Sequence, residues 1–366
     1  MGARIDQFQK FTKKIFTLLI GIYMRYILCF LLILSIFSCS DNKTSNIKLN
    51  DSTNLISDKL ISSPKADGFY LKYKLKKGDK FDYQIKTTSS STQELIADST
   101  ITTNVNQTVQ YRIKLTVDKI DANNLATVTV FVESVILDGI INGQPISYDS
   151  KYIQSSQERV MFAQYEAIKN QRFSINVAVN GEITKIYNMN SIINELLLIQ
   201  NQKNIASKEQ KKELENNFVQ SALRPLSEQL FRKFPFEEVS INYSWIEKYY
   251  SQFALFQIEN IATYQLNEVV NNDKDSVVVI SAGLTINWDG EHNANEQGMT
   301  FYFYDPVVSG SGIVKFNKSL GLVTNSNTTT NMEMVTDITG VDEKKHPFKS
   351  KRIDKTSNTN IVKLVQ

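Results

Sequence analysis

Apolar and polar residues alternate along most of the chain from residue 69 onward, the pattern of β-strands with one buried face. In the stretch LKYKLKKGDKFDYQIK, the apolar face is formed by Leu71, Tyr73, Leu75, Phe81, Tyr83 and Ile85. A second long stretch, YRIKLTVDKIDANNLATVTVFVE, alternates on both sides of a predicted turn at residues 121–124. These lengths of period-two patterning predict antiparallel strands.

Further strands are predicted on both sides of the middle of the chain. FSINVAVNGEITKIYN places Asn180 and Gly181 between two alternating runs, the strongest short-range signal for a β-hairpin. Toward the C-terminus, the same alternation predicts strands over residues 262–270, 277–288, 298–304, 312–316 and 320–337.

The middle of the chain has the period of helices. MNSIINELLLIQN predicts a helix that begins near Asn190 or Ser191, and residues 157–169 predict another. SKEQKKELENNFVQSALRPLSEQLFRKF opens with Ser207 and Gln210 in the spacing of a capping box. Its apolar stripe is formed by Leu214, Phe218, Ala222, Leu226, Leu230 and Phe234. Pro225 is expected to kink this helix or to split it.

The order strands, helices, strands predicts a mainly β (α+β) fold. An apolar helix stripe must be buried, and the hollow face of a curved sheet is the nearest apolar surface. We therefore expect a body at residues 69–340, a curved antiparallel sheet or half-barrel packed against a helical insertion at about 190–234. Two β lobes bridged by the helices are the alternative. Residues 341–366 are rich in lysine and predict a solvated basic tail, with contact to anionic lipid as the alternative.

The N-terminus carries two apolar blocks, residues 15–24 and 26–37, separated by Arg25. Neither reaches the roughly 20 residues that span a bilayer. Joined as one helix, they would place Arg25 near the bilayer centre, at about 2.5–3.5 kcal/mol. The second block has the length of a signal-peptide core. The pattern favours a signal peptide at residues 1–38, with Met24 as the true start, over an uncleaved anchor helix.

The residues Ile36-Phe37-Ser38-Cys39 resemble the bacterial lipoprotein signal, an aliphatic residue and two mostly small residues before a cysteine. Phe37 departs from the usual small residue. The resemblance implies acylation of Cys39 and cleavage before it, so the protein would bind a lipid bilayer through fatty chains worth about 0.8 kcal/mol per methylene. Residues 39–68, rich in Ser, Asn, Asp and Lys, predict a flexible tether. Because Ser40 rather than an aspartate follows, the analogy favours the outer membrane, facing the periplasm.

The composition excludes several classes of catalytic site. Cys29 and Cys39 are the only cysteines, so the body has no disulfide, thiolate nucleophile or cysteine ligand. His292 and His346 are the only histidines, too few for a histidine-rich metal site. The 41 basic against 38 acidic residues give a net charge of +3, no electrostatic reason for nucleic-acid binding. We expect no catalytic residues, cofactor or metal.

One stretch, INWDGEHNANEQG, concentrates oxygen ligands at Asp289, Glu291, Asn293, Asn295 and Glu296. A calcium loop would need glycine where Ala294 stands and glutamate where Thr300 stands, so a plain loop between strands is favoured. Asp289 and Glu291 could alternatively serve as the carboxylate pair of a polysaccharide hydrolase. The aromatic residues form either core or a pocket that stacks on sugars: Trp245, Trp288, Phe301, Tyr302, Phe303 and Tyr304.

Residues from about Leu75 to Val335 resemble a family of uncharacterised Bacteroidota lipoproteins, a domain of unknown function. The resemblance rests on KKGDKFDYQI, FSINVAVNGEITKIYN, FPFEEVSINYSW and GSGIVKFNKSLGLV. The third segment departs, because Asn242 and Tyr243 precede Trp245 where the family tends toward glycine and aspartate. The family implies no activity and no catalytic residue for this chain.

Two functional classes stay open. A non-enzymatic lipoprotein that binds an apolar ligand or an envelope protein should have a continuous apolar cavity between helix 207–234 and the sheet. An envelope polysaccharide hydrolase should instead have at least two acids converging in a polar cleft.

Overall fold

The computed structural model describes residues 68–201, 206–253, 256–272, 275–288, 291–296, 298–341 and 346–365, with the backbone alone for 251–253 and 256–257. The predicted signal peptide, Cys39 and all but the last residue of the predicted tether lie outside these residues.

Strands dominate the described chain. They are β1 (Lys80–Ile96), β2 (Thr100–Ile120), β3 (Ala126–Ile141), β4 (Gln144–Asp149), β5 (Gln171–Val177), β6 (Ile183–Tyr187), β7 (Ser244–Phe253), β8 (Phe256–Asn271), β9 (Ser276–Asn287), β10 (Asn293–Glu296), β11 (Met299–Phe303), β12 (Val307–Asn317), β13 (Leu322–Val341) and β14 (Pro347–Leu364). The helical elements are α2 (Ser156–Met161), α3 (Ala163–Ile168), α4 (Asn190–Ile199), α5 (Lys208–Phe218), the π-helical turn η1 (Val219–Leu223) and α6 (Arg224–Leu230).

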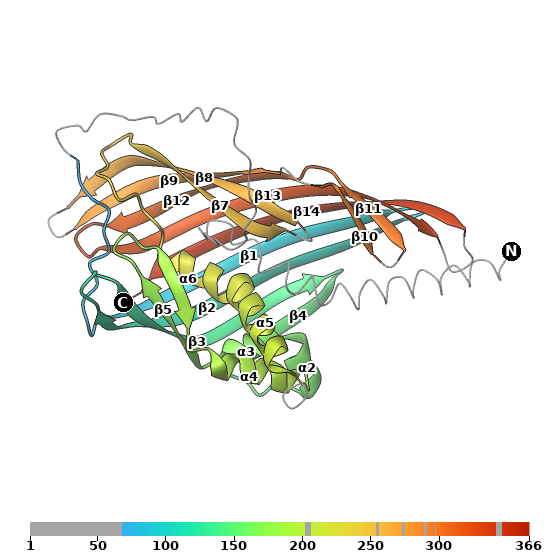
Figure 1. Ribbon diagram of the computed structural model, residues 1–366, viewed down its shortest axis with the longest axis horizontal. Coiled ribbons are helices and arrows are strands. Elements are labelled where there is room, and N and C mark those ends of the chain that lie inside the picture. Colours follow the sequence, from blue (N-terminus) through green and yellow to red (C-terminus); the bar gives the residue numbers. More distant parts are fainter. Residues whose placement is uncertain are drawn as a thin grey trace.

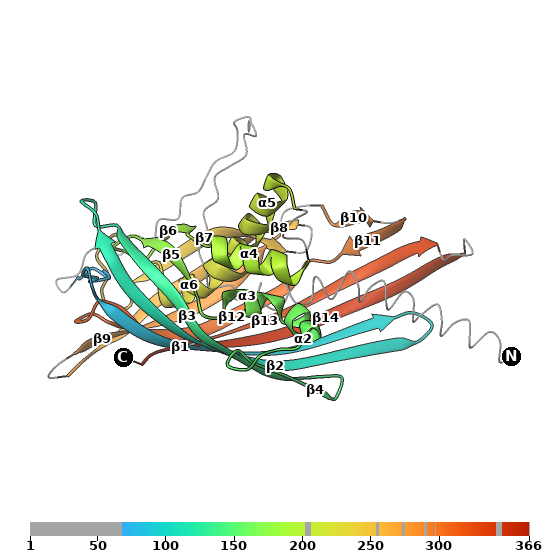
Figure 2. The same cartoon turned by 90° about the horizontal axis from the view of Figure 1, so that it is seen from below.

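All the strands belong to one antiparallel sheet in the order β6-β5-β3-β2-β1-β14-β13-β12-β9-β8-β7, with β4 paired to β3, β11 to β13 and β10 to β11. The sheet curves into an open trough, and the helices lie on its hollow side (Figures 1 and 2). The strands β1, β2, β13 and β14 continue past the helices at one end (Figure 2). The predicted mainly β fold, a curved antiparallel sheet with a helical insertion, is confirmed.

The alternation seen in the sequence becomes the two faces of this sheet. Tyr83 and Ile85 on β1 and Ile113 and Leu115 on β2 point into the trough and are buried. The intervening polar residues face outward, as period-two strands require. The hairpin predicted at Asn180 and Gly181 joins β5 to β6.

The C-terminal region differs from the prediction. Residues 341–366 were expected to form a solvated tail, but β14 lies in the middle of the sheet, paired with β1 on one side and β13 on the other. The physical reason is that the inward face of β14 is mostly polar. The strand therefore lacks the alternation of apolar and polar residues from which strands are predicted. The buried polar residues of this face are Ser350, Asp354, Thr356, Asn358 and Asn360, whereas Lys349, Lys351, Lys355 and Lys363 face outward and are exposed.

The helical insertion begins as predicted. Ser207 caps α5, because its Oγ accepts from the Gln210 N–H (3.2 Å) while Gln210 Oε1 accepts from the Ser207 N–H (2.8 Å). Instead of a break at Pro225, the helix widens into η1 just before it. Proline has no N–H and its ring crowds the preceding turn, and a wider turn relieves both. The helix predicted over 157–169 is two short helices, α2 and α3, that meet at Phe162.

One end of the trough is closed by the segment that follows α6. Lys233 Nζ lies 3.2 Å from Glu247 on the edge strand β7 and 3.9 Å from Glu182 beside the opposite edge strand β6. The Phe234 N–H donates to the Asn180 carbonyl (2.9 Å), which fixes the segment to the β5–β6 turn. Tyr73 packs below it against three aromatic rings 5.4–5.8 Å away, those of Phe231, Phe234 and Phe316.

Candidate functional site, a helix-covered cavity with an amide floor

A cavity of about 40 Å³ lies between the helices and the sheet. Strands β1, β2 and β14 form its floor, and α3, the end of α5, η1 and α6 form its roof. Since a water molecule needs about 10–15 Å³ of such space, the cavity has room for roughly three.

The floor is polar in β1 and β14 although it lies inside the trough, whereas β2 contributes Val109 and Tyr111 beside Gln107. On β1, Thr87 is opposite Asn360 of β14, and the next inward residue, Ser89, is opposite Gln107 of β2 and Asn358 of β14. The Thr87 hydroxyl donates to Asn360 Oδ1 (2.7 Å). Asn358 is 2% exposed, and no described residue forms a hydrogen bond with either polar atom of its side chain.

The roof is mainly apolar. Its apolar side chains are Tyr165, Ile168, Phe218, Ala222, Leu223, Pro225 and Leu226. Two carboxamides interrupt it, Gln164 from α3 and Gln229 from α6. Within the described part of the chain, Gln164 Nε2 and Gln229 Oε1 are buried without a hydrogen-bond partner.

Unpartnered amides on both sides of one cavity are the main feature of this site. A buried polar group that lacks a partner costs about 1–3 kcal/mol, so such groups are rare in folded proteins. Several of them around the same space mark a place where water or a ligand supplies the missing hydrogen bonds.

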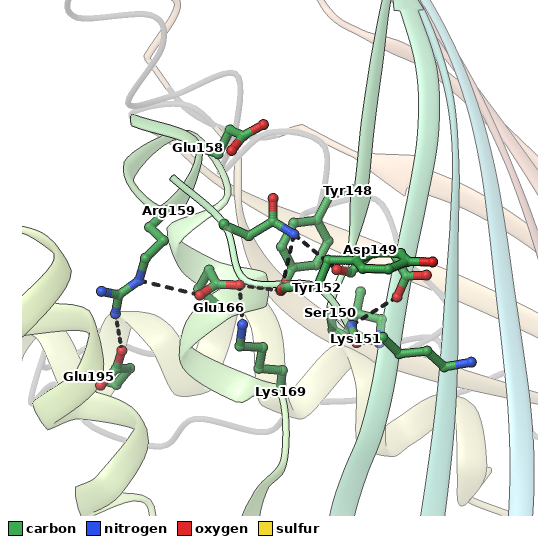
Figure 3. Close-up of polar contacts among 12 residues, drawn as sticks. Tyr148, Asp149, Ser150, Lys151, Tyr152, Glu158, Arg159, Glu166, Lys169 and Glu195 are labelled. Atoms are coloured by element: carbon green, nitrogen blue, oxygen red, sulfur yellow. Dashed lines mark hydrogen bonds and ion pairs between the residues drawn. The ribbon is translucent and has the colours of Figure 1, made fainter. Parts of the chain in front are cut away.

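A buried charge cluster fixes α2 and α3 to their surroundings (Figure 3). Glu166, whose side chain is 3% exposed, accepts from the Tyr148 hydroxyl (2.8 Å) and from Lys169 Nζ (2.6 Å). Arg159 Nε lies 3.4 Å from Glu166, and its Nη2 lies 2.5 Å from Glu195 on α4. Burial, and then the Glu166 carboxylate, raises the pKa of the Tyr148 hydroxyl far above its usual value. The Glu166 charge is therefore used to join β4, α3 and α4.

A second buried carboxylate lies in α6. Glu228 is 3.2 Å from Arg224 Nη1, which also donates to the Ile183 carbonyl of β6 (3.2 Å). Burial raises the pKa of Glu228 to about 8, although Arg224, Arg232 and Lys233 lower it. Among the described side chains that line the cavity, none is an Asp or Glu.

The acidic stretch does not form a second site in the described chain. Asp289 lies outside the described residues, whereas Glu291 is exposed, as are Asn293, Asn295 and Glu296 around it. The residues that the structure describes contain no group of three His, Cys, Asp or Glu side chains placed to hold a metal ion. No described helix is both long and apolar enough to cross a membrane.

Six aromatic residues were candidates for core or pocket in the sequence, and all six lie apart from the cavity lining: Trp245, Trp288, Phe301, Tyr302, Phe303 and Tyr304. Trp245 is buried and stacks on Tyr264 at 5.2 Å, as expected for core packing. Trp288 stacks on His292 at 5.6 Å. Phe303 is buried, whereas Tyr302 and Tyr304 are exposed.

Sequence reasoning missed the floor residues. Asn358 and Asn360 lie in the segment that was predicted to be a tail. Gln107 interrupts an apolar face between Val105 and Val109, a signal that could have identified it. The predicted cavity between helix 207–234 and the sheet is present, but its floor is polar rather than continuously apolar.

The chain belongs to a family of unknown function (DUF6263), whose pattern matches residues 123–323. Membership in an uncharacterised family is thus confirmed, whereas the Bacteroidota origin and the lipoprotein signal stay predictions. No curated protein matches the chain.

Solved structures offer only distant likenesses. The chain is similar to a structure described as lipid-protein interactions in lipovitellin, with 10% identity and a TM-score of 0.36 over 80% of this chain and 25% of that one. It thus spans a quarter of the lipovitellin chain. Two Pseudomonas aeruginosa proteins are also similar: OpdL (6% identity, TM-score 0.18, 79% of this chain and 99% of that one) and OpdQ (5%, 0.20, 78% and 99%).

Proposed function

We propose that this protein is a lipid-anchored, non-enzymatic binding protein of the bacterial cell envelope that holds an amphiphilic ligand between its helices and its sheet. The observation that carries the proposal is the cavity whose lining presents two kinds of surface, unpartnered amides in the floor and the roof and apolar side chains beside them. A ligand with a polar and an apolar part would satisfy both surfaces at once.

The carboxylates argue for binding rather than hydrolysis. Glycoside hydrolysis needs two carboxyl groups about 5–9.5 Å apart on either side of the scissile bond. Glu166 and Glu228 are each engaged with basic side chains, and neither belongs to the described lining of the cavity.

The ligand enters through movement of the roof, because about 40 Å³ is far below the 300–1,000 Å³ of usual small-molecule sites. Among the helical elements of the roof, α5 is held most weakly, since Phe218 is its only buried residue. The π-turn η1 joins it to α6, and such turns often occur at functional sites. Lifting α5 about η1 would withdraw Phe218 from the roof and open the cavity at that side, while α3 and α6 keep their polar contacts.

Co-purification tests the binding role. The full chain, extracted from membranes and analysed by mass spectrometry, should carry an amphiphile in near-stoichiometric amount. Ala222→Leu, which adds volume at the cavity wall, should lose this amphiphile while keeping its unfolding temperature. Ala206→Leu, outside the lining, is the matched control. Equal retention by all three proteins, or an empty wild-type protein, would contradict the proposal.

The lipid anchor is tested by metabolic labelling. Palmitate should label the full chain and the Cys29→Ser variant but not Cys39→Ser, because only Cys39 has the lipoprotein context. An unlabelled wild-type protein would remove the anchor, and with it the predicted place at the outer membrane facing the periplasm.

A further inference from the structure

We infer that the polar part of the ligand is uncharged and carries several hydroxyl or amide groups, as a neutral sugar head group does. This inference rests on the proposed binding function and specifies the chemistry of the same cavity. It separates such ligands from amphiphiles with a phosphate, carboxylate or quaternary ammonium head.

Carboxamides are the commonest polar groups of the site, beside the hydroxyls of Thr87, Tyr111 and Tyr165. Gln107, Asn358 and Asn360 come from the floor, and Gln164 and Gln229 come from the roof. A carboxamide has two N–H donors and one acceptor oxygen, so a set of them suits groups that also donate and accept. Hydroxyl and amide groups do both, whereas a phosphate mainly accepts and a quaternary ammonium does neither.

The unpartnered atoms include both kinds. Among the described residues, Asn358 Nδ2 and Gln164 Nε2 are donors without an acceptor, and Asn358 Oδ1 and Gln229 Oε1 are acceptors without a donor. A ligand that only accepted would leave the two oxygens unsatisfied, and one that only donated would leave the two nitrogens unsatisfied. Each such omission leaves a buried polar atom without a partner and weakens binding.

The acidic side chains of the neighbouring elements already contact basic side chains. Glu228 is paired with Arg224 in α6, and Glu166 is paired with Lys169 in the α3 region. The described lining of the cavity contains no Lys, Arg, Asp or Glu. A charged head group would thus lose its hydration without meeting a counter-ion, which disfavours its binding.

The spacing of the floor suits a ring with several substituents. Thr87 and Ser89 define two successive inward rows that cross β1 and β14. Neighbouring strands lie about 4.8 Å apart, and inward residues on one strand repeat about every 6.8 Å. The result is a flat array of polar groups on the scale of one hydroxylated ring. Tyr111 and Tyr165, with ring centroids 6.4 Å apart, add aromatic surface to the same cavity.

The test compares three probes with the same alkyl chain, namely octyl glucoside, octyl phosphate and octyltrimethylammonium. Each is titrated calorimetrically into the full chain held in an amphipathic polymer. Octyl glucoside should bind at least tenfold more tightly than either charged probe. Asn358→Leu and Gln107→Leu should each weaken glucoside binding about tenfold.

Two controls keep this result interpretable. Thr336→Val removes another buried hydroxyl of the same face, outside the cavity lining, and should leave glucoside binding unchanged. Asn358→Leu should keep or raise the unfolding temperature, because removing an unpartnered buried amide relieves a cost. Charged probes that bind as tightly as the glucoside, or floor variants with unchanged glucoside affinity, would overturn the inference while the binding function stands. Binding of none of the probes would remove both.

Discussion

Asn358 is a buried amide whose polar atoms meet no described partner, although a leucine of similar size would suit a protein core. Residues that lower stability without a structural role are expected where binding needs them, because natural proteins need only exceed a stability threshold. At the residue scale, the floor amides are therefore where stability and the proposed binding function oppose each other.

Gly181 is held by close approach as well as by its backbone angle. Its φ is +92°, and an added Cβ would lie 2.1 Å from the Arg232 carbonyl oxygen and 2.4 Å from the Tyr73 ring. Gly181→Ala should destabilise the fold by about 3 kcal/mol or more in urea unfolding. Gly143, with φ +82° and open space around it, is the control, and Gly143→Ala should cost about 1–2 kcal/mol. Equal losses would show that the contact at Arg232 does not matter.

Glu228 should make stability fall as pH rises. Its pKa is about 8 in the folded chain, against an ordinary 4.5. Between these values the folded chain keeps a proton that the unfolded chain has released, so this contribution is complete below pH 4.5 and lost by about pH 8. In urea unfolding from pH 5 to 8, the wild type should lose stability relative to Glu228→Gln. Parallel curves for the two proteins would contradict the raised pKa.

At the scale of elements, the roof of the cavity is fixed at its two ends and loose between them. Helix α3 is tied to β4 and α4 through Glu166, and α6 is tied to β6 through Arg224. Helix α5 buries a single residue. Backbone amide hydrogen exchange should therefore be faster in α5 than in α3 or α6.

The anchor of α3 depends on a charge that is almost fully buried. Glu166→Gln leaves Lys169 and Arg159 without their shared carboxylate and should lower the free energy of unfolding by about 3 kcal/mol. Glu195→Gln removes a carboxylate from the same arginine, but that side chain is 29% exposed. It should therefore cost no more than about 1 kcal/mol. Thermal and urea unfolding of the two variants give the comparison, which a reversed order would refute.

Elements with regular apolar faces could be predicted from the sequence, and β14 could not. The first strands, the hairpin at Gly181 and the cap at Ser207 follow from local patterns that the structure keeps. The inward positions of β14 hold Asn358 and Asn360 instead of apolar residues. Polar residues therefore alternate with other polar residues along this part of the strand. The polar floor of the cavity could not be predicted for the same reason, because a polar inward face can be recognised only when the strand pairing is known.

At the scale of the whole molecule, β14 joins the two halves of the sheet. It pairs with β1 from Tyr83 to Ile96 and with β13 from Asn325 to Val341. Both the cavity floor and the continuity of the core therefore depend on the last strand.

Removing this strand should abolish folding. A chain that ends at residue 341 would leave β1 and β13 with unpaired inner edges, and we expect it to show no cooperative unfolding transition in circular dichroism. A chain that lacks only residue 366 should unfold as the full chain does. A folded protein without β14 would mean that the remaining strands can close the gap between β1 and β13.

The pairing of the first strand with the last also constrains how the chain matures. During synthesis, β1 is made long before β14 and must wait for this neighbour until the strands between them in the sequence have also been made. Such long-range pairing slows folding, and it leaves the edges of β1 and β13 unpaired and prone to aggregation until β14 pairs with them. This topology predicts that folding depends on a chaperone that holds the unfolded chain. A nascent chain stalled before β14 should be degraded rather than folded.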